Sequence, residues 1–323
     1  MQKRLVAELI PLLAVAVLVS PFCWGQVWAA EKLNYATAFK AAVSQQLPVE
    51  IALEKGLWRK QGLNVEHIPF RAGSRMGRAM AAGKIDIGTG NSPSIIQQIT
   101  RGVPVIMIAA TQEWSDWSIW VLPGGPVKRP ADLKGRKMGI SRIGGTSHAM
   151  ARVAVKSLGI EKEVKIVAVG GTSARVAALK TGVIDAFPQA LSSAAPMVEK
   201  GGIRRLMDLG KKLPQPWIDQ VIVARMEFIR TNAELAKKAM RGILQAIAFI
   251  KANPEYAVKK VMSIKRYNRA AAELSLKGVV YSDDPVIKRA AVENVRGFLI
   301  DYGLIKAQEA PPVEKLFTNR LVR

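Results

Sequence analysis

Two short loops carry the side chains best suited to binding chemistry. Gly73–Ser74 follows the apolar segment Leu63–Phe70, and Asn91–Ser92 follows the segment Ile85–Gly88. Each loop ends a predicted strand and begins a predicted helix, with Ser92 as an N-cap and Pro93 at the first helical position. A helix N-terminus presents unpaired backbone N–H groups and a partial positive charge. Both loops are therefore candidates for binding an anionic or carboxylate-bearing molecule.

The same pattern of residues recurs later in the chain. The later copies lie 99 residues after the earlier ones, with Ser173, Ala178, Gly182, Ile184 and Asp185 following Ser74, Ala79, Gly83, Ile85 and Asp86. A period near 100 is too long for a solenoid repeat. The alternative is chance, because such fragments occur in many α/β proteins. We interpret the recurrence as two similar α/β lobes, with a serine-bearing loop from each facing a shared cleft.

Further candidate ligand contacts stand beside loops of this kind. Arg142 and Arg175 could each pair with a sulfonate, carboxylate or phosphate through the guanidinium group. Trp114 could form a wall of the cleft. The structural alternatives are solvated arginines, a core tryptophan, and serines at 74 and 173 that only cap their helices.

Catalytic and metal chemistry are poorly supported. The sequence has His67, His148 and one cysteine, Cys23, so no second histidine or thiol stands near to complete a metal site or a dyad. Asp86 and Asp185 occupy equivalent places in the repeat, which favours structural roles at strand ends over a catalytic pair. No G-x-G-x-x-G spacing suggests a dinucleotide. We expect no catalytic residues, no metal and no cofactor.

Residues 1–29 are predicted to be a cleaved secretory signal peptide. Lys3 and Arg4 precede the apolar run Leu9–Val19, and Val27-Trp28-Ala29 offers a cleavage site. Cys23 raises a lipoprotein alternative, but the residue directly before it is not small. The mature chain would then contain no cysteine and hence no disulfide. No later segment is apolar for long enough to span a membrane, so a periplasmic location is expected.

The formal net charge of the 323-residue chain is +23. Such a charge invites a nucleic-acid hypothesis. However, the basic residues are dispersed with no run of five, and no nucleic-acid-binding module is recognisable. The charge is better suited to raising encounter rates with anions or acidic envelope surfaces. No nucleic-acid partner is expected.

The order of predicted elements suggests one lobe inserted into another. The first lobe takes residues 30–121, the second takes 122–222, and residues 223–323 return to the first lobe with a helical tail that braces it. The two crossings, near 118–126 and 214–226, would form a hinge of two strands. Within the first lobe, a loop at Phe39–Leu47 is predicted to lead into a helix from Pro48 to Lys55.

Several of these motifs together resemble a known family. DLKG at 132–135 before the strand Lys137–Ser141, AAGKID at 81–86, Gly90-Asn91-Ser92, and LKTGVIDA at 179–186 are similar to the sulfonate/nitrate/taurine-type periplasmic solute-binding proteins of ABC importers. That group is related to the thiamine-pyrimidine synthases. The resemblance is clear over residues 32–225 and looser in the tail. It implies a type II periplasmic binding protein with two lobes, each a doubly wound sheet with helices on both faces.

The resemblance also implies which residues face the ligand. Its binding loops correspond to Ser44, Gln45 and Gln46; Gly73 and Ser74; Asn91 and Ser92; Gly144, Gly145, Thr146 and Ser147; and Ser173, Ala174 and Arg175. Together with Trp114 and Arg142 these form the predicted ligand-binding set. No known specificity follows from Gln45, Gln46 or Trp114.

The expected function is that of an exported, monomeric solute-binding protein. It would capture a small anionic organic molecule, such as a sulfonate or carboxylate, and deliver it to the membrane permease of an ABC importer. Ligand binding would shift a pre-existing equilibrium towards the closed form. The alternatives are an envelope ligand-sensing module that acts on a partner kinase, and a pyrimidine-forming enzyme on the same fold.

Overall fold

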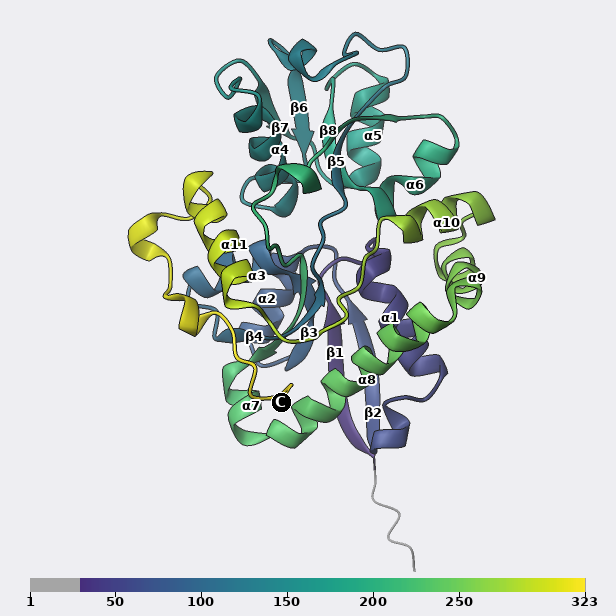
Figure 1. The fold of residues 1–323 in the computed structure, drawn as a ribbon, viewed down its shortest axis with the longest axis vertical. Coiled ribbons are helices and arrows are strands. Elements are labelled where there is room, and N and C mark those ends of the chain that lie inside the picture. Colours follow the sequence, from purple (N-terminus) through teal and green to yellow (C-terminus); the bar gives the residue numbers. More distant parts are fainter. Residues whose placement is uncertain (1–29, 323) are drawn as a thin grey trace, which may run out of the picture.

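The computed structural model describes residues 30–322, which fold into two lobes (Figure 1). The predicted signal peptide and Cys23 lie outside the described residues. The first lobe occupies the lower half of Figure 1, and the second occupies the upper half. Within the described residues, no helix is both long and apolar enough to span a membrane.

The first lobe is built on a five-stranded sheet in the order β2-β1-β3-β10-β4. Strand β1 pairs in parallel with β2 and β3, whereas β10 runs antiparallel to β3 and β4. Strand β4 is buried along its whole length, as expected of an apolar strand covered on both faces. The strands are β1 (Glu31–Thr37), β2 (Leu63–Pro69), β3 (Ile87–Asn91), β4 (Val105–Gln112) and β10 (Gln220–Arg225).

The second lobe repeats this arrangement. Strand β6 pairs in parallel with β7, and a bridge between Met138 and Ala186 joins β6 to the start of β8. Strand β5 runs antiparallel to β8 and β9, so the order β7-β6-β8-β5-β9 matches that of the first lobe. The strands are β5 (Trp117–Val121), β6 (Lys137–Ile140), β7 (Lys165–Ala168), β8 (Phe187–Ala190) and β9 (Arg204–Asp208). The recurrence in the sequence therefore reflects a repeated fold.

Equivalent helices follow equivalent strands in the two lobes. They are α1 (Val43–Glu54), α2 (Gly73–Ala81) and α3 (Ser92–Thr100) in the first lobe, and α4 (Thr146–Ser157), α5 (Thr172–Lys180) and α6 (Leu191–Glu199) in the second. Each begins just after the carboxyl end of a strand. In open α/β sheets this is the edge at which ligands bind.

The strand pairing moves both lobe boundaries from their predicted positions. Strand β5 belongs to the second sheet, so the first crossing is residues 113–116 and precedes residue 121. Strand β10 begins in the first sheet at Gln220, so the chain returns before residue 222. The first crossing leads into β5 and the second into β10, which are the antiparallel strands of their sheets. The pairing of these two strands determines where each crossing ends.

Helix α1 begins five residues before Pro48, so residues 43–47 of the loop predicted at Phe39–Leu47 are helical. Proline inside a helix removes the N–H that would bond the carbonyl four residues earlier. Here that carbonyl belongs to Ser44, and the hydroxyl of Tyr281 donates to it at 3.3 Å. A donor from the distant tail thus allows the helix to continue past Pro48.

The C-terminal tail contacts the first lobe, which it was predicted to brace, and also contacts the second lobe. Helix α8 crosses α1, and α11 lies beside α3 (Figure 1). Helix α10, in contrast, packs on α6 of the second lobe, where Ser275 Oγ donates to the Ser192 carbonyl at 2.6 Å. The tail contains α7 (Met226–Thr231), α8 (Ala233–Ala252), α9 (Pro254–Lys265), α10 (Arg269–Lys277) and α11 (Arg289–Asp301).

Short 3-10 turns complete the described chain, at Arg59–Gln61, Pro130–Leu133, Gly210–Lys212, Ala307–Glu309 and Val313–Lys315. The largest apolar cluster joins the lobes. It includes Ile95 of α3, Met150 of α4 and Phe298 of α11. This shared core holds the edges of the two sheets towards each other.

Candidate ligand-binding cleft

Four helices that begin at the facing edges of the two lobes have no side-chain cap. The N-cap residues of α2, α3, α4 and α5 are Ala72, Asn91, Gly145 and Gly171, and none accepts a capping hydrogen bond through its side chain. Ser92 lies one position past the N-cap, so its predicted capping role was wrong. Uncapped N–H groups with the positive end of the helix dipole are a suitable environment for an anion.

The serines at 74 and 173 do not cap their helices. Each is the second residue of its helix, and Ser74 is half-buried while Ser173 is exposed. A side chain at Gly77 would collide with Gln98 Oε1, so the absence of side chains at Gly73 and Gly77 lets α2 lie close against α3. The capping alternative for the two serines is thus removed.

Several predicted ligand residues of the first lobe are hydrogen-bonded to the second crossing. Gln45 Nε2 donates to Gln220 Oε1 at 2.8 Å, and Asn91 Nδ2 donates to Asp219 Oδ2 at 3.2 Å. The Ser92 amide donates to the Asp219 carbonyl at 2.9 Å, and its hydroxyl donates to the carbonyl of Ile218. These side chains fix the hinge end of β10.

Gln46 is engaged by the tail. The Lys265 ammonium donates to Gln46 Oε1 and to the Lys40 carbonyl, both at 2.7 Å. Burial lowers the pKa of Lys265 to about 8. Together with the bond from Tyr281 to Ser44, this contact ties the first turns of α1 to the tail.

Arg175 is a buried cation in the second lobe. Only 3% of the residue is exposed, and the guanidinium donates to the Pro188 carbonyl and, at 2.7 Å, to Gln189 Oε1. A weaker bond of 3.4 Å reaches Thr172 Oγ1, and Phe187 lies under the guanidinium at 5.5 Å. Burial lowers its pKa to about 10. Among residues 30–322 no carboxylate forms an ion pair with it.

The loop between β6 and α4 contains a glycine with positive φ and two serines that are hydrogen-bonded to each other. Gly144 has φ of +74°, a conformation that glycine adopts without steric cost. Ser147 Oγ accepts from the Ser141 amide at 2.9 Å and contacts the Ser141 hydroxyl at 2.7 Å. Thr146 is 5% exposed, and its hydroxyl has no partner among the described residues. His148 Nδ1 accepts from the Gly144 amide at 3.2 Å, and burial lowers the pKa of this imidazole.

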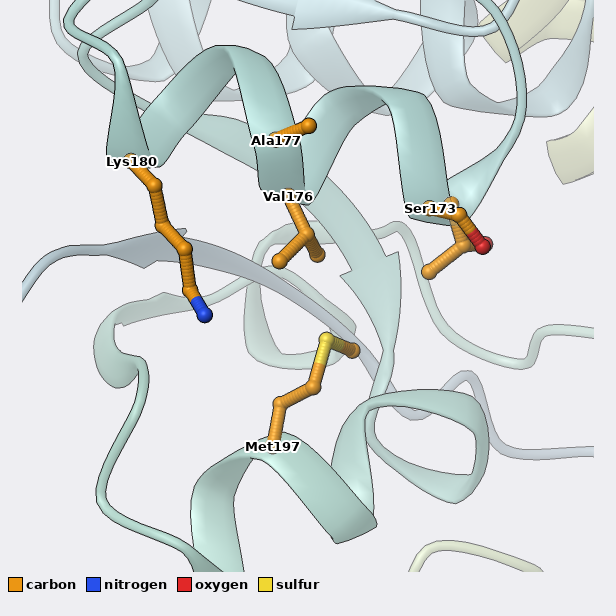
Figure 2. A pocket seen from close by; sticks show the side chains of 6 residues that line it. Ser173, Val176, Ala177, Lys180 and Met197 are labelled. Carbon is orange, nitrogen blue, oxygen red and sulfur yellow. The ribbon is translucent and has the colours of Figure 1, made fainter.

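Ser173 lines a groove on the second lobe (Figure 2). The groove has a volume of about 440 Å³ and is bounded by α5 on one side and Met197 of α6 on the other. Val176 and Ala177 supply its apolar wall, and Lys180 stands at the end away from Ser173. All of its residues belong to the second lobe.

Trp114 lies in the first crossing and packs on the turn at Gly210. A side chain at Gly210 would approach the Trp114 ring to 3.0 Å and the Ser115 carbonyl to 2.2 Å. The Trp114 carbonyl accepts from Gln112 Nε2 at 2.7 Å. The indole is partly exposed, so a wall of the cleft and a packed position are both consistent with its place.

Sequence reasoning missed two acidic residues that lie in the crossings. Asp116 accepts from the Ser192 amide at 2.8 Å and so caps α6, and burial raises its pKa to about 6. Burial, with the charge of Asp116, raises the pKa of Asp219 to about 7. Each precedes an apolar strand by one residue. The sequence signal that could have identified them is an acidic residue directly before each of the strands β5 and β10. Within residues 30–322 no cluster of potential metal ligands occurs.

Comparison with known proteins identifies the family. A family profile described as NMT1/THI5 like matches residues 44–257. The chain belongs to the NMT1/THI5-like family. A binding protein from Brucella abortus (strain 2308) is 27% identical over 77% of each chain, and the taurine-binding periplasmic protein of Escherichia coli (strain K12) is 25% identical over 79% of this chain and 77% of its own.

A solved structure shares the fold of this NMT1/THI5-like chain. The periplasmic aliphatic sulphonate binding protein SsuA from Escherichia coli superposes with a TM-score of 0.74 at 19% identity, covering 90% of this chain and 92% of that one. The chain therefore has the two-lobed periplasmic binding protein fold, as the resemblance implied.

Proposed function

We propose that this protein is an exported solute-binding protein that captures a small organic anion and delivers it to an ABC importer. The observation that carries the proposal is Arg175, a buried guanidinium without a carboxylate partner among the described residues, in the first turn of an uncapped helix. The relatives named for binding taurine and sulphonates support the same class of ligand.

Arg175 gives the second lobe a buried positive charge. A buried cation without a counter-ion is unfavourable, and an anion bound nearby offsets that cost. Arg175 sits almost wholly beneath the surface, so it acts through its field and by orienting Gln189 and Thr172. These two groups, together with the free N–H groups of α5, would then contact the ligand.

A thermal-shift screen of the purified exported protein tests the proposal. The panel contains sulfonates, nitrate, carboxylates, aromatic acids and pyrimidines. A ligand at about 100 times its dissociation constant stabilises the fold by about 2.7 kcal/mol, a shift of several degrees. We expect one class of anion to produce this shift, and Arg175→Gln to abolish it.

Arg230→Gln is the matched control. It removes the same charge from an exposed arginine of α7, whose side chain is 74% exposed, and should keep the full shift. A flat screen across all anions, or an equal shift in Arg175→Gln, would contradict the proposal. Consumption of the ligand by the purified protein would favour the enzyme alternative. Normal ligand uptake by cells that lack the protein would favour the sensing alternative.

A further inference from the structure

Four arginines meet where the two lobes approach each other. Arg75 and Arg78 are exposed residues of α2, and Arg101 follows the last turn of α3, all in the first lobe. Arg142 belongs to the loop after β6 in the second lobe and is half-buried. We call these residues the four-arginine cluster.

The cluster spans the boundary between the lobes. Burial lowers the pKa of Arg142, and the positive charges of Arg101, Arg78 and Arg75 lower it further, so the other three guanidiniums lie within electrostatic reach of Arg142. A side chain at Gly144 would lie 3.4 Å from Arg101 Nη2. The loop that carries Arg142 therefore packs directly against Arg101.

The charge of the cluster is not compensated by the part of the chain that the structure describes. None of the four side chains takes part in an ion pair there, whereas Asp86, which closely follows α2, is paired with Arg225 at 2.7 Å. Like charges held together at a lobe interface oppose closure. A bound anion would turn this repulsion into attraction.

Two buried polar atoms beside the cluster indicate the kind of anion. Thr146, next to the loop of Arg142, has an unpaired hydroxyl, and Gln97, 2% exposed, has an unpaired Oε1. A side chain at Gly144 would lie 3.9 Å from that Gln97 oxygen. An anion that is both an acceptor for arginine and a donor for Gln97 must retain an O–H group. A monoprotonated phosphate has both, whereas sulfate at neutral pH has no O–H group.

We propose that the four-arginine cluster is a phosphoryl-binding site that bridges the two lobes. Arg142 and Arg101 hold the phosphoryl oxygens from opposite lobes, which suits the paired donors of guanidinium groups. Arg75 and Arg78 add charge from α2. Gln97 accepts the remaining O–H, and Thr146 donates. The occupant is either free phosphate or the phosphoryl group of a phosphomonoester. The proposal does not depend on the ligand of Arg175.

Calorimetric titration of the purified exported protein with inorganic phosphate tests this site, at an ionic strength of about 0.15 M. Arg142→Gln and Arg101→Gln should each weaken binding at least about tenfold, which corresponds to about 1.4 kcal/mol. Arg230→Gln should change it less than about twofold, since exposed charges contribute little at this salt concentration. Arg175→Gln should leave it intact, which separates this test from that of the proposed function.

A second titration series identifies the source of the phosphoryl group. Tighter binding of glycerol phosphate than of phosphate would assign the site to phosphomonoesters, and the reverse would assign it to the free ion. Binding of sulfate as tight as that of phosphate would overturn the phosphoryl assignment. Absence of binding by both phosphate compounds, or equal weakening in Arg142→Gln and Arg230→Gln, would overturn the site itself.

Thermal unfolding at low salt gives an independent signature. Without phosphate, Arg142→Gln should unfold at a higher temperature than the wild-type protein, because the substitution removes repulsion between the lobes. Phosphate should raise the wild-type midpoint by more than that of Arg142→Gln, because the variant binds phosphate at least about tenfold more weakly, so the lead of the variant should shrink or reverse. A difference between the two midpoints that phosphate does not change would count against a site that joins the lobes.

Discussion

The buried carboxylate of Asp219 should make the stability of the protein fall as the pH rises. Its pKa in the fold is raised to about 7 from 3.8, because burial and the neighbouring Asp116 disfavour the charged form. In the unfolded chain the same group is ionised above pH 4. Between these two pKa values the carboxyl is ionised in the unfolded chain but still protonated in the fold. Raising the pH in this range therefore stabilises the unfolded state relative to the folded state.

The size of the effect follows from the shift. From pH 5 to pH 7 the folded state holds this proton and the unfolded state does not. The free energy of unfolding then falls by about 1.36 kcal/mol for each of these two pH units. Asp219 is 1% exposed, so solvent screening reduces this little. The free energy of unfolding should drop by about 3 kcal/mol from this group. For a chain of this size that corresponds to about 6 °C in the midpoint temperature.

Thermal unfolding of the wild-type protein and Asp219→Asn between pH 5 and pH 8 measures this contribution. Asn91 and Gln220 both donate to the same oxygen, Oδ2, which the amide keeps as its carbonyl oxygen, so the variant mimics the neutral carboxyl and should be about as stable as the wild-type protein at pH 5. Towards pH 8 it should become more stable than the wild-type protein by about 6 °C, because only the wild-type protein has a buried carboxyl left to ionise. Asp283→Asn, at a side chain that is 99% exposed, is the control and should run parallel to the wild-type protein.

The pH dependence of the difference in midpoint between wild type and variant decides the outcome, because every carboxylate except the interacting neighbour Asp116 changes both profiles equally. A difference that stays constant within a degree from pH 5 to pH 8 would refute the assignment of a raised pKa to Asp219. A variant that loses stability relative to the wild-type protein as the pH rises would refute the sign of the linkage.

Three further substitutions have definite expected outcomes in the same unfolding assay. Gly242→Ala would place a Cβ 2.2 Å from ring atoms of buried Trp58 and should destabilise the protein by about 1–3 kcal/mol. Gly297→Ala, within a helix and with no atom within 4 Å of the new Cβ, should instead stabilise it by about 0.5–1 kcal/mol. Tyr281→Phe leaves the buried Ser44 carbonyl without a donor and should cost about 1–3 kcal/mol.

The sequence predicted the duplicated architecture because the repeat preserves residues with strict backbone demands. Gly83 and Gly182 both have positive φ at the ends of α2 and α5, at +70° and +72°. Asp86 and Asp185 stand at equivalent strand entries, where each makes structural contacts, with Arg225 and with the Lys137 amide. Residue type indicates the local geometry at these positions, so the repeat could be inferred from the sequence.

The errors arose where a distant segment decides local structure. The start of α1 depends on Tyr281, more than two hundred residues away, and the position of α10 depends on the surface of α6. The lobe boundaries depend on which sheet accepts β5 and β10. These partners lie far away in the sequence. Helix propensity and hydrophobic periodicity within a segment therefore could not predict the start of α1, the position of α10 or the lobe boundaries.

The predicted binding residues divide by lobe in a way that bears on mechanism. Those of the first lobe, such as Gln45 and Asn91, are hydrogen-bonded to the second crossing, so they control the geometry of the hinge. The second lobe instead holds a cation in Arg175 without an ion-pair partner in the described chain. Since a ligand shifts the conformational equilibrium only through contacts that differ between states, we infer that the second lobe binds the anion first. The polar network around Asp219 then determines how far the first lobe closes on it.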